Sequence, residues 1–137
     1  METVKTRYLG DLRTEIVHLQ SGTKIITDAP TDNQGKGESF SPTDLFAASY
    51  ASCALTIIGI AAQTHGFDIV GAVVKTTKVM GNNPRHIAEL IVEFIFPHDR
   101  YTEKEHKIIE GAIKGCPIAN SLPQELKITR TVKFEKY

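Results

Sequence analysis

SPTDLFAASYASCALTIIGIAAQTHG, residues 41–66, is the most apolar stretch of the chain and carries no charged side chain over residues 45–62. Ser41 suits the position that caps a helix, Pro42 suits the first helical position, and Asp44 can close a capping box with Ser41. The glycine at the end of the stretch is typical of the position just beyond a helix. The stretch therefore predicts one long helix. Because it is apolar on almost every side, we expect protein to surround it.

The same stretch is borderline as a membrane span. Its uncharged part counts 18 residues, and a span takes roughly 20 predominantly apolar residues. Small and polar side chains dilute it, and no lysine or arginine flanks it closely. These diluting residues are Ser49, Ser52, Thr56 and Gly59. We therefore predict a helix buried in protein, and no membrane partner.

The rest of the chain alternates strand patterns with one more helix pattern. Residues 3–27 are typical of strands with a turn at residues 20–22, and residues 28–39 form a loop rich in turn formers. Residues 102–114 predict a second helix with a Thr102–Glu105 capping box. Further strands are predicted at residues 68–80, 86–96 and 126–134. The pattern predicts a single α+β domain over residues 1–137, in which antiparallel sheets wrap around a long central apolar helix.

Composition narrows the class of protein. The 137 residues carry 16 basic and 16 acidic side chains, so the formal net charge is zero. No basic excess is present to bind nucleic-acid phosphates, and we expect no nucleic-acid partner. The first ten residues lack the apolar stretch of a signal peptide, which predicts a cytoplasmic protein. The balanced charge also favours self-association, and we do not expect one subunit to cover the long helix fully, so we expect a homodimer.

Two cysteines are the candidates for chemistry. Cys53 lies in the middle of the long apolar helix, and Cys116 lies 63 positions later, between a helix-ending glycine and a proline. A reducing compartment disfavours a permanent bridge between them, and two cysteines alone cannot hold zinc, which needs about three or four ligands. The simplest interpretation is that Cys53 is a core residue. Cys116 can begin a new helical turn, where free N–H groups stabilise a thiolate.

If the two thiols lie close together, they can instead act as a pair that reduces peroxides. A thiolate attacks the O–O bond of a peroxide and becomes a sulfenic acid, which the second thiol condenses to a disulfide. A thiol reductant then reopens the disulfide. An arginine can stabilise the thiolate and donate to the peroxide oxygens, and a carboxylate can orient that arginine. Apolar surroundings favour an organic peroxide over hydrogen peroxide.

The segment SPTDLFAASYASC, followed after a second helix by CPIANSL, resembles the OsmC/Ohr family of osmotically inducible and organic hydroperoxide resistance proteins. The resemblance covers most of the chain. It implies an intertwined homodimer that reduces organic hydroperoxides without metal or flavin, with electrons from a dithiol or lipoyl-type reductant. In this resemblance Cys53 takes the place of the peroxide-attacking cysteine and Cys116 that of the resolving cysteine.

The family's arginine and its acidic partner each have more than one candidate in this chain. The family's arginine follows a glycine in the N-terminal strands, and here Arg13 is the first candidate, with Arg7 and Arg130 as alternatives. In the family a glutamate directly follows the helix-opening proline, whereas this chain has Thr43 there. The nearest acid, Asp44, is our candidate for its role, although a capping acid is an equal interpretation. Glu38, in the preceding loop, is a further candidate.

Two other functions remain open from the sequence. The chain could bind a small apolar ligand without turning it over, an alternative that the threonine at position 43 keeps open. It could also be a thiol sensor that forms the disulfide but turns over too slowly to be a peroxidase. The sequence predicts no cofactor and no metal site.

Overall fold

The structure, a computed structural model, describes residues 1–135 and divides the chain into two compact units, Met1–Phe46 and Ala47–Tyr137. The first unit is an antiparallel sheet in the order β1-β2-β3, followed by a short 3-10 helix. The prediction that residues 1–137 form one domain stays a prediction. The elements of this unit are β1 (Val4–Gly10), β2 (Arg13–His18), β3 (Lys24–Asp28) and η1 (Thr31–Asn33).

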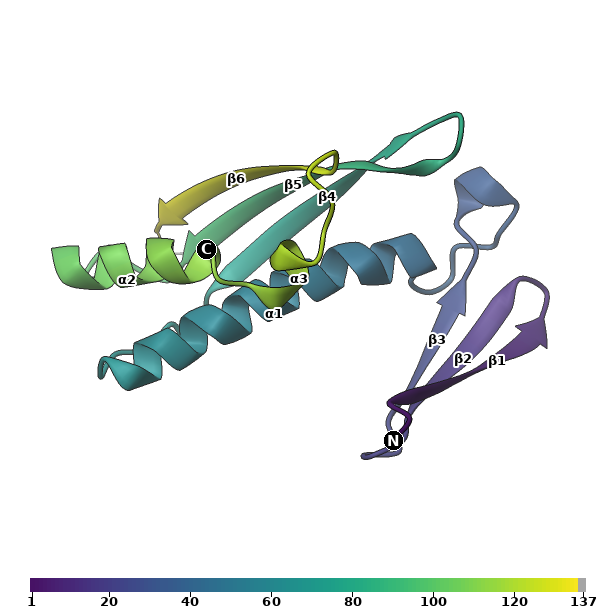
Figure 1. Cartoon of the computed structure of the whole chain (residues 1–137), viewed down its shortest axis with the longest axis horizontal. Coiled ribbons are helices and arrows are strands. Elements are labelled where there is room, and N and C mark those ends of the chain that lie inside the picture. The colour runs from purple at the N-terminus through teal and green to yellow at the C-terminus, as the bar shows by residue number, and fades with distance from the viewer. Residues whose placement is uncertain (136–137) are drawn as a thin grey trace. The chain divides into compact units, whose positions relative to one another are not determined.

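The second unit places helices on one face of a three-stranded sheet (Figure 1). The long helix α1 (Pro42–Thr64) begins in the first unit and continues here. The other elements are β4 (Val73–Gly81), β5 (His86–Phe96), α2 (Glu103–Ile113), α3 (Pro117–Asn120) and β6 (Lys127–Phe134). The predicted α+β class and the long central helix are therefore confirmed.

The prediction that the sheets are antiparallel is correct for β4 and β5 but wrong for β6. The strands β5 and β6 pair in parallel, with Leu90 beside Ile128 and Phe94 beside Val132. Two parallel strands need a long crossover, and α2 and α3 supply it between Phe96 and Lys127. A helix between two strands is the sequence signal for this arrangement.

The start of α1 forms as the sequence predicts. The Ser41 hydroxyl accepts a hydrogen bond from the Asp44 backbone N–H at 3.0 Å, and the Asp44 carboxylate accepts from the Ser41 backbone N–H at 2.9 Å. The helix ends at Thr64, and Gly66 follows with φ of +79°. The second predicted capping box, between Thr102 and Glu105, is also present. These local signals need only a few neighbouring residues, which is why the sequence reveals them.

The strand expected over residues 68–80 begins later, at Val73. The Asp68 side chain accepts a hydrogen bond from the Val70 backbone N–H, and Gly71 adopts a φ of +94°. This turn occupies the first five residues of the predicted strand. The apolar side chains of these residues resemble a strand pattern, but the aspartate and the glycine favour a turn instead.

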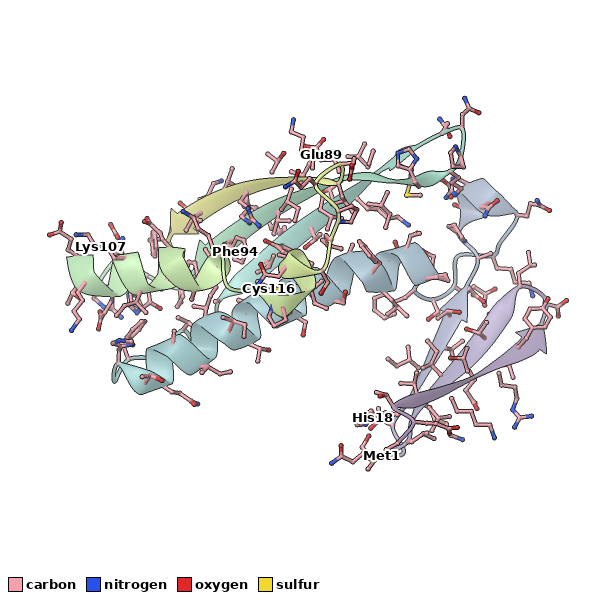
Figure 2. The ribbon with its side chains drawn as sticks, in the orientation of Figure 1. Met1, His18, Glu89, Phe94, Lys107 and Cys116 are labelled. Atoms are coloured by element: carbon pink, nitrogen blue, oxygen red, sulfur yellow. The ribbon has the colours of Figure 1, made fainter. Side chains whose placement is uncertain are left out.

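The core of the second unit lies between the sheet and its helices. On β5 the alternation is as expected, because Leu90, Val92, Phe94 and Phe96 are all fully buried. Glu89 lies on the opposite face from Phe94 (Figure 2). On α1 only one stripe is buried within the described chain, and Ile60 is 55% exposed, which agrees with the expectation that one subunit does not cover the helix fully. The buried stripe consists of Ala47, Tyr50, Ala54, Ile58 and Ala62.

By length and composition α1 could also cross a membrane, with a mean hydropathy of 1.8 over its best window. The core helix of a soluble protein passes the same test. The helix buries one stripe of side chains in the second unit, and 28% of its most apolar window is buried.

Candidate active site

The two cysteines, which are far apart in the sequence, meet in the second unit. The side chains of Cys53 and Cys116 are neighbours, close enough for the Cys53 thiol to raise the pKa of the Cys116 thiol, and both are free thiols. Cys53 is half-buried on α1, next to the buried stripe, whereas Cys116 is fully buried. Figure 2 shows Cys116 where the chain enters α3. The arrangement places one accessible thiol beside one protected thiol.

Cys116 begins α3 as the sequence predicts, with Pro117 at the first helical position. Burial raises the pKa of the Cys116 thiol above its ordinary value. The backbone N–H groups of Ala119 and Ile118 act in the opposite direction, whereas the neighbouring Cys53 thiol raises the pKa further. The predicted stabilisation by N–H groups is therefore present, but burial outweighs it. Cys116 is therefore held as a protonated thiol, which is a weak nucleophile until it loses its proton.

Arg13 lies in the first unit, at the start of β2, and is paired with two carboxylates. Its Nε and Nη2 atoms donate to the two carboxylate oxygens of Asp28 at 2.7 and 3.0 Å, and Nη2 also contacts Glu38 at 3.4 Å. Asp28 is only 2% exposed and also accepts from the Glu38 backbone N–H. Hydrogen bonding to Arg13 lowers the pKa of Asp28, and the same pair raises the pKa of Arg13. Arg13 is therefore a fixed, permanently charged group.

Asp28, the main partner of Arg13, was not predicted from the sequence. It lies directly across from Arg13 in the pairing of β2 with β3. The signal was present, because a hairpin centred on the turn at residues 20–22 places positions 13 and 28 side by side. We had assigned Asp28 to the loop instead of to the end of a strand.

Asp44 has the capping role that we gave as its equal interpretation. Its carboxylate accepts from the Ser41 backbone, and the Thr43 hydroxyl contacts that of Ser41 at 3.1 Å. Glu38, the further candidate, contacts Arg13. A catalytic role for Asp44 stays a prediction.

The second unit has an arginine of its own, which contacts the helix that carries Cys53. Arg130, on β6, donates from Nε to the Tyr50 hydroxyl at 2.7 Å. Tyr50 is fully buried on α1 and precedes Cys53 by three residues. Tyr50 was also missed, since nothing in the sequence links it to a residue 80 positions away. The remaining candidate, Arg7, is exposed on β1.

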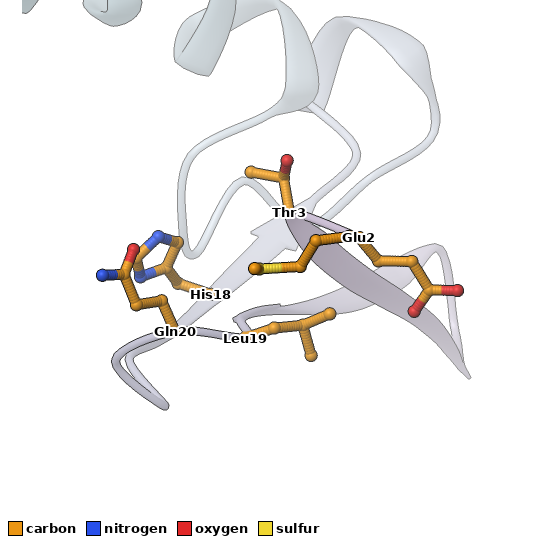
Figure 3. Close-up of a pocket in the computed structure, with 6 residues that line it drawn as sticks. Glu2, Thr3, His18, Leu19 and Gln20 are labelled. Carbon is orange, nitrogen blue, oxygen red and sulfur yellow. The ribbon is translucent and has the colours of Figure 1, made fainter.

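Arg13 and Cys53 belong to different units, so the assignment of this arginine to this thiol stays a prediction. Two hollows that are lined by described residues lie away from both clusters. One hollow in the first unit is open to solvent and involves the first residues of the chain (Figure 3), and a smaller one in the second unit lies near the end of α1. Over residues 1–135 no three histidine, cysteine or acidic side chains gather as metal ligands would.

Comparison with known proteins identifies the fold. The family model described as OsmC-like protein matches residues 35–131. A crystal structure from Psychrobacter arcticus, named as a candidate osmotic stress induced and detoxification response protein, is 47% identical, covers 96% of each chain and has a TM-score of 0.90. No functionally curated protein matches significantly.

More distant structures share the fold alone. An organic hydroperoxide resistance protein OsmC from Legionella pneumophila is 19% identical, with a TM-score of 0.71 over 97% of this chain and 98% of that chain. An organic hydroperoxide resistance protein from Elizabethkingia anophelis is 18% identical, with a TM-score of 0.75 over 98% of both chains. Because the family model spans more than half of the chain, this protein belongs to the family of OsmC-like proteins.

Proposed function

We propose that the protein is a thiol-dependent peroxidase that reduces organic hydroperoxides in the cytoplasm as part of oxidative stress defence. The observation that carries the proposal is that the Cys53 and Cys116 thiols are neighbours, because a two-step thiol mechanism needs both sulfur atoms close together. Two structures with this fold are named organic hydroperoxide resistance proteins, which supports the choice of substrate.

In the proposed reaction the Cys53 thiolate attacks one oxygen of the hydroperoxide and the O–O bond breaks. The sulfur becomes a sulfenic acid, and the alkoxide leaves as an alcohol after it takes a proton. The Cys116 sulfur then attacks the Cys53 sulfur, a disulfide forms, and water leaves. A dithiol such as dihydrolipoamide reduces the disulfide and becomes a cyclic disulfide itself.

The half-buried position of Cys53 suits the first step and the full burial of Cys116 suits the second. A protonated Cys116 loses its proton as it attacks, when the sulfenic oxygen of Cys53 leaves as water. In the proposal Arg13 stabilises the attacking thiolate, and Asp28 and Glu38 hold its guanidinium in one orientation. Asp44 maintains the start of α1, which carries Cys53.

We further propose that two chains form the intertwined homodimer that the family resemblance implies. Residues 1–46, all of which the structure describes, contain no buried apolar side chain. A sheet without a buried face is not stable alone, so this surface needs cover. The exposed apolar side chains of this unit include Val4, Tyr8, Leu9, Ile25 and Phe40. Sedimentation analysis tests the dimer, and a monomer at micromolar concentration contradicts it.

The peroxidase proposal is tested by peroxide consumption with a dithiol. The wild type is expected to consume cumene and tert-butyl hydroperoxide faster than hydrogen peroxide, and Cys53→Ser to abolish the reaction. Cys116→Ser keeps the first reduction of peroxide but stops before the disulfide. Mass spectrometry after one equivalent of peroxide is expected to show the Cys53–Cys116 bridge. A wild type that forms the bridge without steady turnover is a thiol sensor, and one inert to every peroxide is no peroxidase.

A further inference from the structure

The helix-facing side of the β4-β5-β6 sheet is apolar along β5 but not along its neighbours. We call this side the inner face and define it by Leu90, Val92 and Phe94, which are fully buried. Val92 pairs with Thr76 on β4 and with Arg130 on β6, so these three residues form one row across the inner face. An arginine in such a row needs a reason, because an apolar neighbour gives its charge no compensation.

Tyr50 fixes the position of Arg130 without neutralising it. The Nε–H of Arg130 donates to the Tyr50 hydroxyl at 2.7 Å, and its Cζ lies 5.8 Å from the centre of the Tyr50 ring. The phenol is fully buried whereas Arg130 is exposed, so the guanidinium lies where the core meets solvent. A neutral partner holds the arginine in one orientation and leaves its positive charge intact.

No carboxylate pairs with Arg130 among residues 1–135; its hydrogen bond to Tyr50 and its contact with that ring account for its interactions. The acidic residues of the neighbouring strand lie on the outer face, where Glu89 contacts Lys127 and Glu93 contacts Lys133. The terminal nitrogens of Arg130 form a planar pair of donors suited to a carboxylate. The described protein offers them none.

A second group in the same row also lacks a partner. The Thr76 hydroxyl is buried and makes no hydrogen bond within the described residues. A buried hydroxyl without a partner is uncommon and calls for a ligand or a water molecule. The row Thr76–Val92–Arg130 therefore carries polar groups with unused hydrogen-bonding capacity at both ends.

The Arg130 end of the row is connected to the thiols through α1. Tyr50 precedes Cys53 by three residues on α1, so the two side chains share one helix face with roughly 5 to 6 Å between their Cβ atoms. A molecule that reacts at Cys53 and extends along the apolar helix toward its N-terminus brings its far end to Arg130. An anionic group at that end meets the free edge of the guanidinium.

We propose that Arg130, held by Tyr50, binds the carboxylate of an alkyl-chain molecule whose other end reacts at the thiols. The proposal rests on the proposed peroxidase function for the identity of that molecule, which is either a hydroperoxide with a carboxylate or a dithiol reductant with one. The binding of a carboxylate itself is independent of turnover. Arg130 is thus a specificity-determining residue and not the group that activates Cys53.

The peroxide test compares linoleate hydroperoxide with its methyl ester. In the wild type kcat/KM is expected to be higher for the acid, and Arg130→Met is expected to lower the acid-to-ester ratio about tenfold or more, as for loss of a charge-assisted bidentate contact. Arg130→Lys keeps the positive charge but loses the planar pair of donors. Its acid-to-ester ratio should therefore lie between those of the wild type and Arg130→Met. The matched control is Lys133→Met, which removes the same charge from the outer face of the same strand. A ratio that changes equally in Arg130→Met and the control overturns the peroxide assignment.

The reductant test repeats the comparison with dihydrolipoate and dihydrolipoamide. A ratio that falls in Arg130→Met for these dithiols but not for the peroxides assigns the carboxylate to the reductant. If neither ratio responds to Arg130→Met, the proposal is wrong.

A binding measurement separates this proposal from the proposed function. Calorimetry of the wild-type protein with decanoate and with methyl decanoate is expected to show preference for the acid, and Arg130→Met to lose that preference about tenfold. If the wild type prefers the acid but does not turn over peroxide, the carboxylate site is supported and the peroxidase proposal is contradicted. Turnover without any preference contradicts the site alone. Arg130→Lys provides the same readouts if Arg130→Met does not fold.

Discussion

Arg13 and Arg130 show how differently two arginines of one chain can be held. In the first unit Arg13 is paired with the buried Asp28 and with Glu38, so its charge is compensated within the protein. In the second unit Arg130 is held by the neutral hydroxyl of Tyr50, so its charge is retained. The difference teaches that the ion-paired arginine is positioned by its carboxylates, whereas the tyrosine-held arginine remains available to an external anion.

The largest effect is expected from a substitution that removes the pairing of Arg13 with Asp28. Arg13→Met leaves Asp28 buried without its cation, and we expect it to lower the unfolding midpoint more than any other substitution discussed here. Arg130→Met leaves no buried carboxylate behind and should change the midpoint far less. Chemical denaturation of both variants measures the contrast. Equal losses of stability in the two variants contradict the comparison.

A double variant sharpens this result. Asp28→Asn removes the buried charge, so adding it to Arg13→Met should recover part of the lost stability. If the double variant is as unstable as the sum of the single variants, Arg13 and Asp28 are not energetically coupled.

The Asp28 carboxylate also predicts a dependence of stability on pH. Because Arg13 lowers its pKa in the folded protein, the folded state binds fewer protons than the unfolded state. This contribution to stability is complete above the unfolded pKa of about 4 and is lost as pH falls through the lower folded-state pKa. Asp28→Asn should therefore flatten the acid limb of the stability curve, measured by urea unfolding from pH 6 to pH 2. An unchanged acid limb assigns the dependence to other carboxyl groups.

The two thiols of the second unit should differ in reactivity. Cys116 is fully buried and its pKa is raised, so at pH 8 we expect iodoacetamide to modify the half-buried Cys53 faster than Cys116. Peptide mass spectrometry of reduced protein over time measures the two rates. Faster modification of Cys116 contradicts its assignment as the protected thiol.

The smallest expected effect concerns the Tyr50 hydroxyl. Tyr50→Phe removes the acceptor of the Arg130 Nε–H but keeps the buried ring, and we expect a loss of about 1 kcal/mol in the free energy of unfolding. Thermal unfolding with Lys133→Met as a surface reference measures it. A loss as large as that of Arg13→Met indicates that Arg130 is a structural residue after all.

Much of this molecule is determined locally and could be predicted. The two capping boxes, Ser41 with Asp44 and Thr102 with Glu105, depend on residues three positions apart. The buried face of β5 follows from its alternation, and the turn at Cys116 follows from the proline after it. The resemblance to OsmC-like proteins followed from the same short segments.

The remaining features depend on pairings between distant segments. The parallel pairing of β6 with β5, the hydrogen bond of Arg130 to Tyr50 and the pairing of Arg13 with Asp28 each join residues that no local pattern connects. The same limit explains why Asp44 was our candidate acid. It was near the expected position in the sequence, whereas Asp28 is near Arg13 across a hairpin.

The sequence by itself determined a long apolar helix with a cysteine in its middle, a second cysteine before a proline, and the family. Only the tertiary structure decided that the two thiols are neighbours, that one is protected, and which arginine has carboxylate partners. The physical reason is that helix ends and strand faces depend on residues a few positions apart. A thiol's protonation and an arginine's charge balance depend on whatever side chains folding brings around them.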